Sequence, residues 1–123
     1  ERRSKFEAAV LLERYKLVND LFRRLEKMRT NLNRHQDRDS LQASLPNGEL
    51  RELTEVFEDL EIHRLVLGDA FHSLFTAQAN LTLAIVNASD AADLARVQTA
   101  LAENKASVRA AAEAAFRLSQ ISW

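Results

Sequence analysis

Apolar residues recur three and four positions apart through the first third of the chain, which is the spacing of an amphipathic helix. The pattern predicts one long helix over about residues 4–38. Its main apolar face holds Phe6, Val10, Leu17, Leu21, Met28 and Leu32, with Val18 and Leu25 beside them. A narrower stripe, about a third of a turn away, holds Ala8, Leu11, Tyr15 and Phe22. We expect the main face to pack into a core and the narrower stripe to be available to a partner helix.

Residues 39–48 predict the first chain reversal, because they include the only proline and one of the two glycines. The apolar spacing resumes over residues 49–87 and is interrupted at Gly68-Asp69, where glycine can end one helix and aspartate can begin the next. One helix of about 40 residues and two of about 20 are alternative predictions for this stretch. A last helix begins near residues 87–90, where Ser89 or Asp90 can cap it, and continues to the end of the chain.

The charges of the first two helical segments are complementary. Residues 1–41 hold 11 Lys and Arg against 7 acidic residues, a net charge of +4, whereas residues 49–66 hold 2 against 6, a net charge of −4. We therefore expect these segments to pack as antiparallel neighbours, although exposed ion pairs add little stability.

The composition is that of one helical domain. A chain of 123 residues has room for one core, and two Gly and one Pro favour helices over strands and turns. The net charge of −1 gives no overall attraction to nucleic acid or to an anionic membrane. No run of about 20 apolar residues is present that could span a bilayer. The absence of Cys excludes disulfides and thiolate zinc sites.

Patterns typical of enzymes and metal sites are missing from the sequence. The histidines are His35, His63 and His72, and no Glu-x-x-His pair is present. Asp69 and His72 could share a metal, but two ligands are too few for a site. The chain has no glycine-rich phosphate loop and no recognisable pairing of a nucleophile with a base. We therefore expect a protein that is not an enzyme and that holds no metal or cofactor.

The most informative motif is the basic run Arg29-Thr30-Asn31-Leu32-Asn33-Arg34, followed by Arg38. At about 100° per residue, Asn33 lies roughly 40° from Arg29, whereas Arg34 lies roughly 140° and Arg38 roughly 180° away. The two pairs occupy different flanks of the helix, so two copies related by a two-fold axis can aim one flank of each at a shared anion. Arginine meets a carboxylate with two parallel hydrogen bonds. We expect a homodimer that binds a small carboxylate at its seam.

This run, with Arg38 beyond it, resembles the ligand-binding signature in the first periplasmic helix of aspartate- and serine-type bacterial chemoreceptors, which are methyl-accepting chemotaxis proteins. The resemblance implies that residues 1–123 are a single periplasmic sensor domain, excised from between two transmembrane helices of an inner membrane protein. The first residue, Glu1 rather than Met, agrees with that expectation. A domain between two spans needs both of its ends on one side. We therefore expect an all-α fold, an antiparallel up-down four-helix bundle; three long helices, with termini at opposite ends, are the alternative.

The resemblance also implies roles for the basic residues. Arg29 and Asn33 of one subunit would hold the α-carboxylate of an amino acid or a related organic acid. Arg34 and Arg38 of the other subunit would complete the site.

Members of this family close the pocket at the start of the last helix. The family's Phe and Thr-Gln elements are not reproduced there, and this chain offers Asn87 and Ser89 instead. Asp90 is a further departure, since its carboxylate could pair with a ligand ammonium or repel a second carboxylate. The identity of the ligand is therefore left open.

The resemblance implies the function of a chemotaxis transducer's sensor domain, which would signal across the membrane, and it also implies that the signal is a small sliding of the last helix against the first. Cytoplasmic kinase and adaptor partners are implied by the family alone. We expect no nucleic-acid partner, because the basic residues are interleaved with acidic ones.

Two alternatives stay open: the sensor domain of a histidine kinase, and a ligand-free helical scaffold or adaptor. In the scaffold, each arginine would be a solvated residue or pair within its helix, as Arg29 can with Glu26.

Overall fold

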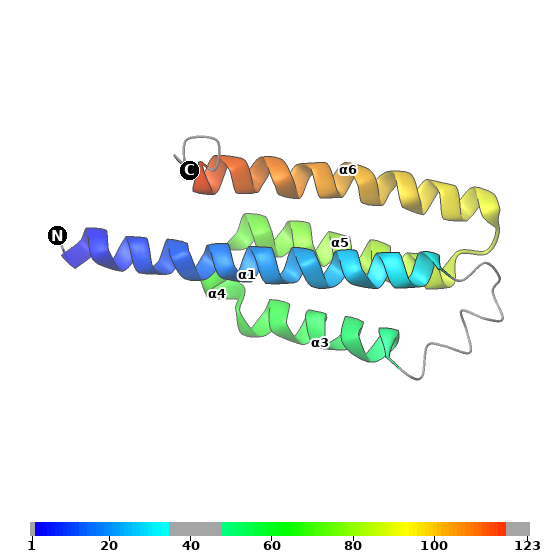
Figure 1. The fold of residues 1–123 in the computed structure, drawn as a ribbon, viewed down its shortest axis with the longest axis horizontal. Helices are drawn as coiled ribbons and strands as arrows, with labels where there is room; N and C mark the ends of the chain where they lie inside the picture. The colour runs from blue at the N-terminus through cyan, green and yellow to red at the C-terminus, as the bar shows by residue number, and fades with distance from the viewer. Residues whose placement is uncertain (1, 35–47, 118–123) are drawn as a thin grey trace.

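The computed structural model describes residues 2–34 and 48–117, and all regular structure in these two stretches is helical (Figure 1). The helices are α1 (Arg2–Asn33), α3 (Glu49–Ile62), α4 (Arg64–Leu67), α5 (Asp69–Asn87) and α6 (Ala91–Phe116). The prediction of an all-α fold is confirmed. None of the described helices is long and apolar enough to cross a membrane.

The helices lie alongside one another and alternate in direction along the chain. In Figure 1, α1 and α5 run from left to right, whereas α3 and α6 run back. α1 contacts α3, α4, α5 and α6, and α5 packs closely on α6. As a result α1 begins and α6 ends toward the same side of the molecule, although the first turns of α1 extend beyond the other helices (Figure 1).

The predicted interruption at Gly68 is confirmed, and one continuous helix over residues 49–87 is wrong. Gly68 has φ 84° and ψ 155°, a backbone conformation that is open almost only to glycine. Arg14 fastens α1 to this corner, because its Nε donates a hydrogen bond of 2.8 Å to the carbonyl of Val66. A second interruption at His63, which separates α3 from α4, was not predicted.

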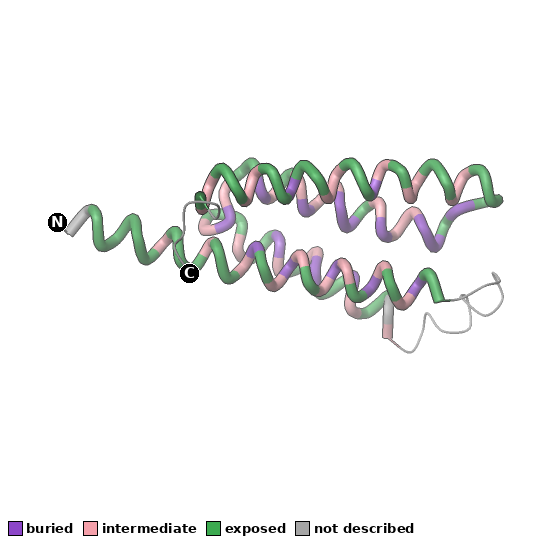
Figure 2. The backbone as a smooth tube through the Cα atoms, turned by 45° about the horizontal axis from the view of Figure 1, so that its top comes forward, coloured by how far each residue is buried: buried purple, intermediate pink, exposed green. Residues whose placement is uncertain are grey.

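The core lies where α1, α3, α5 and α6 face one another (Figure 2). Phe75, Val56, Leu67 and Ala79 are fully shielded from solvent at its centre. From the predicted main face of α1, the buried side chains are Val18, Leu21, Leu25, Met28 and Leu32. The three-and-four spacing thus identified the buried part of α1 correctly.

The first turns of α1 differ from the prediction. Phe6, placed on the main apolar face, is 70% exposed, and Val10 is only half-buried. Their spacing continues the core stripe, but α1 extends past the ends of the neighbouring described helices, so none of these helices covers its first turns (Figure 2). Helical periodicity reports which face is apolar and not how far the packing partners reach.

The narrower stripe also differs in part from the prediction. Ala8 and Leu11 are exposed, but Tyr15 and Phe22 contact α6 of the same chain. The Tyr15 ring meets that of Phe116 edge-on, with centroids 5.3 Å apart. Tyr15 remains 38% exposed beside this contact, so α6 covers the second part of the stripe only in part, and the first part is fully available to a partner helix.

The expected charge complementarity between α1 and α3 is present. The Arg24 guanidinium lies 2.7 Å from a carboxylate oxygen of Asp59 and 3.5 Å from one of Glu52. Arg24 is mostly buried, with 18% of its side chain exposed, whereas both acids are more open to solvent. Because the two acids keep 36% and 43% of their side chains exposed, we expect these pairs to add little stability.

Candidate functional site

The predicted binding residues gather at one end of the molecule. Arg29, Asn33 and Arg34 lie at the C-terminal end of α1, and the turn between α5 and α6 lies at that same end (Figure 1). This is the end opposite to the one where α1 begins. Arg38 lies outside the described residues.

Arg29 belongs to an ion cluster that joins α1 to α6. Its Nε and Nη2 donate hydrogen bonds of 3.3 and 3.0 Å to the Glu26 carboxylate. Lys105 of α6 donates a hydrogen bond of 2.9 Å to the same carboxylate. Partial burial opposes ionisation of Glu26, but the hydrogen bonds from Arg29 and Lys105 outweigh that cost, so the pKa of Glu26 lies below its ordinary value. Arg29 is therefore positioned by a partner that a ligand carboxylate would have to displace.

The lowered pKa of Glu26 predicts a pH-dependent contribution to stability. Ionised Glu26 stabilises the fold above its ordinary pKa of 4.5, and that contribution is lost as the pH falls through the lower folded-state pKa. We expect Glu26→Gln to reduce the free energy of unfolding by about 1 kcal/mol at neutral pH, the upper end of the range for ion pairs that remain partly open to solvent. The difference from the native chain should vanish in acid. Urea denaturation at a series of pH values measures both effects.

Glu13→Gln is the matched control, because Glu13 pairs only loosely with Lys16, at 3.5 Å and with both side chains 62% exposed. Its stability should follow that of the native chain at every pH. Equal pH dependence in the two variants would contradict the assigned role of the Glu26 cluster.

Asn33 and Arg34 occupy different surroundings. The side-chain oxygen Oδ1 of Asn33 accepts a hydrogen bond of 2.7 Å from Nε2 of Gln98 in α6, so Asn33 lies on the same flank as Arg29. Arg34 follows the last residue of α1 and is exposed, and its backbone N–H donates to the carbonyl of Asn31. Arg29 and Asn33 are thus brought together beside α6, whereas Arg34 faces solvent.

The turn between α5 and α6 places the other two predicted residues. Asn87 is the last residue of α5 and is exposed. The backbone N–H and the hydroxyl of Ser89 both donate to the Asp93 carboxylate, at 3.0 and 3.4 Å. Asp90 caps α6 by accepting a hydrogen bond of 2.7 Å from the N–H of Asp93. The prediction that this region caps the last helix is confirmed, and these cap bonds already occupy Ser89 and Asp90.

Asp93 is the central acceptor of this cap. The hydrogen bond from the Ser89 backbone and the ion pair with Arg96 lower the pKa of Asp93. An ionised carboxylate in the first turn also suits the positive end of the helix dipole. Among the residues of the turn, Asn87 therefore has the amide that a ligand could reach without breaking the cap.

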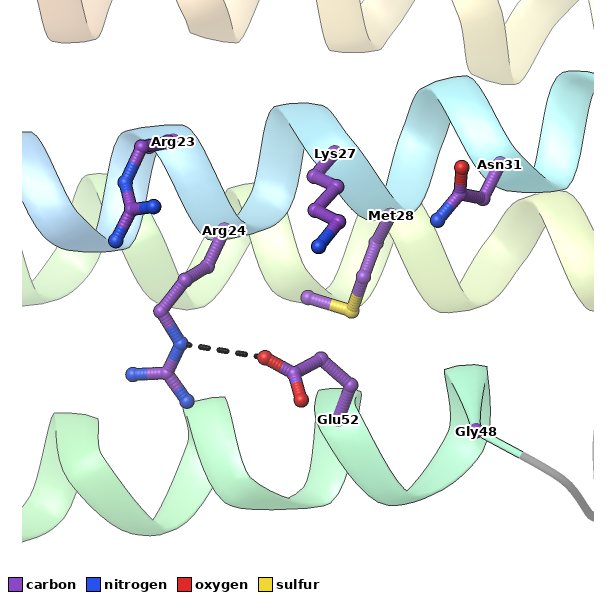
Figure 3. Close-up of a pocket in the computed structure, with 7 residues that line it drawn as sticks. All are labelled: Arg23, Arg24, Lys27, Met28, Asn31, Gly48 and Glu52. Carbon is purple, nitrogen blue, oxygen red and sulfur yellow. Dashed lines mark ion pairs between the residues drawn. The ribbon is translucent and has the colours of Figure 1, made fainter.

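The structure has a basic groove between α1 and α3 that the sequence analysis did not predict. It encloses about 420 Å³ and is lined by Arg23, Arg24, Lys27, Met28, Asn31, Gly48 and Glu52 (Figure 3). Figure 3 shows Arg24 and Glu52 directed toward each other across it. Lys27 precedes Arg34 by two helical turns and so shares its flank. The seven-residue spacing between Lys27 and Arg34 could therefore have predicted that both side chains lie on one flank of α1.

No metal centre is present in residues 2–34 and 48–117, where no group of three or more His or acidic side chains could hold an ion. His72 is instead 3.1 Å from a carboxylate oxygen of Glu61. Comparison of the chain with protein-family models, with curated proteins and with solved structures finds no match.

Proposed function

We propose that this chain is the periplasmic sensor domain of a chemotaxis transducer and that it binds a small amino acid or organic acid at the seam of a homodimer. In this proposal α1, α3 with α4, α5 and α6 form an antiparallel up-down four-helix bundle. Transmembrane helices on both sides of the domain attach it to the inner membrane. Kinase and adaptor partners lie in the cytoplasm.

The observation that carries the proposal is the division of the molecule into two ends. α1 begins and α6 ends at one end, whereas the basic run and the α5–α6 turn share the other (Figure 1). An arrangement of this kind leaves the basic residues accessible to solutes while the first and last helices lead toward the membrane. The resemblance of the basic run to the chemoreceptor signature supports the same function.

The ion cluster at Arg29 suggests how binding would be coupled to the helices. A ligand carboxylate competes with Glu26 for the Arg29 guanidinium, because both are acceptors for the same fork of N–H groups. Glu26 would keep its bond to Lys105 of α6. Ligand binding therefore changes the link between α1 and α6, and only a ligand with different affinities for the two helix packings can signal.

A thermal-shift screen against amino acids and organic acids tests this function. A ligand at about 100 times its dissociation constant adds about 2.7 kcal/mol to the free energy of unfolding of the protein. The melting temperature of the protein should therefore rise clearly. We expect at least one carboxylate to stabilise the native chain and the corresponding neutral amide to have no effect. If no acid raises the melting temperature, under conditions where the homodimer forms, the sensor function is contradicted.

A ligand-free scaffold is the second candidate, and one observation favours it. Arg29 already has a carboxylate partner within α1, as an arginine with a purely structural role would.

The sensor domain of a histidine kinase has the same extracytoplasmic requirements, and the cytoplasmic segment of the protein distinguishes it from a chemotaxis transducer.

A further inference from the structure

A second groove lies between α1 and α6, near the middle of α1. It encloses about 150 Å³ and is mostly apolar. The side chains that line it are Tyr15, Val18, Asn19 and Phe22 of α1, and Val108, Arg109, Ala112 and Phe116 of α6. An apolar cavity of about 150 Å³ is large enough to hold one benzene ring.

The apolar wall of this groove is a set of packed aromatic rings. The Tyr15 ring stands at 87° to that of Phe116, with centroids 5.3 Å apart. Phe116 in turn stacks on Phe71, at 5.8 Å and 11°, and Phe71 is buried in the core. Packing of Phe116 against the core holds this wall in place, so the groove offers a preformed aromatic surface. A further aromatic ring can meet such a surface edge-on or offset.

The polar groups of the groove favour an anion. The Arg109 guanidinium lies 5.7 Å from the centroid of the Phe22 ring. Within the described parts of the chain Arg109 forms no ion pair, whereas Lys105, over the same ring, is paired with Glu26. Asn19 adds a carboxamide to the lining. A cation with no ion pair among the described residues, beside an aromatic slot, complements a ligand that has a ring and a carboxylate.

We propose that this groove binds a small aromatic carboxylate, with its ring among Tyr15, Phe22 and Phe116 and its carboxylate on Arg109. This site is distinct from the seam at Arg29 and does not depend on it. Its ligand would contact α1 and α6 of a single chain.

Fluorine NMR of the chain labelled with fluorotyrosine tests the proposal, because Tyr15 is the only tyrosine and gives a single resonance. Phenylacetate is the probe, with acetate and benzyl alcohol as the carboxylate-only and ring-only controls. We expect phenylacetate to shift the resonance saturably at millimolar concentration, and acetate to leave it unchanged. Arg109→Gln should lower the affinity for phenylacetate about fivefold, which is the effect of losing an exposed ion pair. It should not change the response to benzyl alcohol.

Two further variants separate the groove from nonspecific binding. Ala112→Leu fills the groove and should abolish the response to both phenylacetate and benzyl alcohol, provided that circular dichroism shows the native helix content. Arg51→Gln removes an exposed arginine of α3 and should change nothing. The proposal is overturned by a shift that does not saturate, or by equal phenylacetate affinity in the native chain and Arg109→Gln. It is also overturned if sedimentation shows that the chain is a dimer and phenylacetate neither shifts the resonance nor dissociates the dimer.

Discussion

Replacement of Phe75 by alanine is expected to lower the free energy of unfolding by about 3–5 kcal/mol. The Phe75 side chain has no exposed surface, and its ring packs against that of Phe71 with centroids 6.4 Å apart. Alanine would remove the buried ring and leave a cavity that rigid helices close only in part. Since small domains are stable by only about 5–15 kcal/mol, much of the fold's stability would be lost. Urea denaturation followed by circular dichroism measures the change.

Phe6→Ala is the matched control for this experiment. The same ring is deleted, but at a position that is 70% exposed, so the expected change is within about 0.5 kcal/mol. A large loss at Phe6 with a small one at Phe75 would mean that the packing of α1 is not as described.

Loss of either Arg29 or Arg34 at the dimer seam is expected to weaken binding of the ligand found in the screen by tenfold or more. A carboxylate held by arginine hydrogen bonds loses about 1.5–3 kcal/mol with each charged partner removed, and about 1.4 kcal/mol is one decade in affinity. Arg29→Ala and Arg34→Ala homodimers should each show this loss by calorimetric titration. Arg51→Ala, on the exposed surface of α3, should bind with native affinity.

Mixed dimers test whether the two arginines come from different subunits. In a dimer of one Arg29→Ala chain and one Arg34→Ala chain, one seam keeps both arginines and the other loses both. About half of the sites should therefore retain native affinity. Leu11→Cys, at a residue that is 41% exposed on the narrower stripe, can lock the pair by a disulfide across the first helices. Complete loss of binding in the mixed dimer would place both arginines in one subunit's site, and unchanged affinity in both homodimers would leave the basic run without a role in binding.

Features that depend on neighbouring residues could be predicted from the sequence. The buried face of α1 from Val18 to Leu32 follows from apolar spacing. The break at Gly68 follows from a backbone conformation that only glycine adopts readily, and the cap at Asp90 from a short side chain that accepts a backbone hydrogen bond. Each of these depends on residues within one or two helical turns.

Features that depend on distant residues could not be predicted in this way. Gln78 interrupts an apolar pattern, yet it is buried and accepts a hydrogen bond of 2.6 Å from Asn104 of α6. Phe6 continues an apolar pattern, yet it is exposed because the other described helices end before the first turns of α1. In both cases the environment of the side chain is set by a helix remote in sequence.

The candidate site shows the same division. Apolar spacing by itself determined that the chain is helical. Helical geometry determined that Arg29 and Asn33 share one flank while Arg34 lies on another, because angular position on a helix depends only on residue number. Only the tertiary structure decided that α6 supplies Lys105 and Gln98 to the first flank, and that the start of α3 forms a basic groove with the Lys27 flank. These contacts depend on how far each helix extends and on the register in which helices pack, which no local pattern specifies.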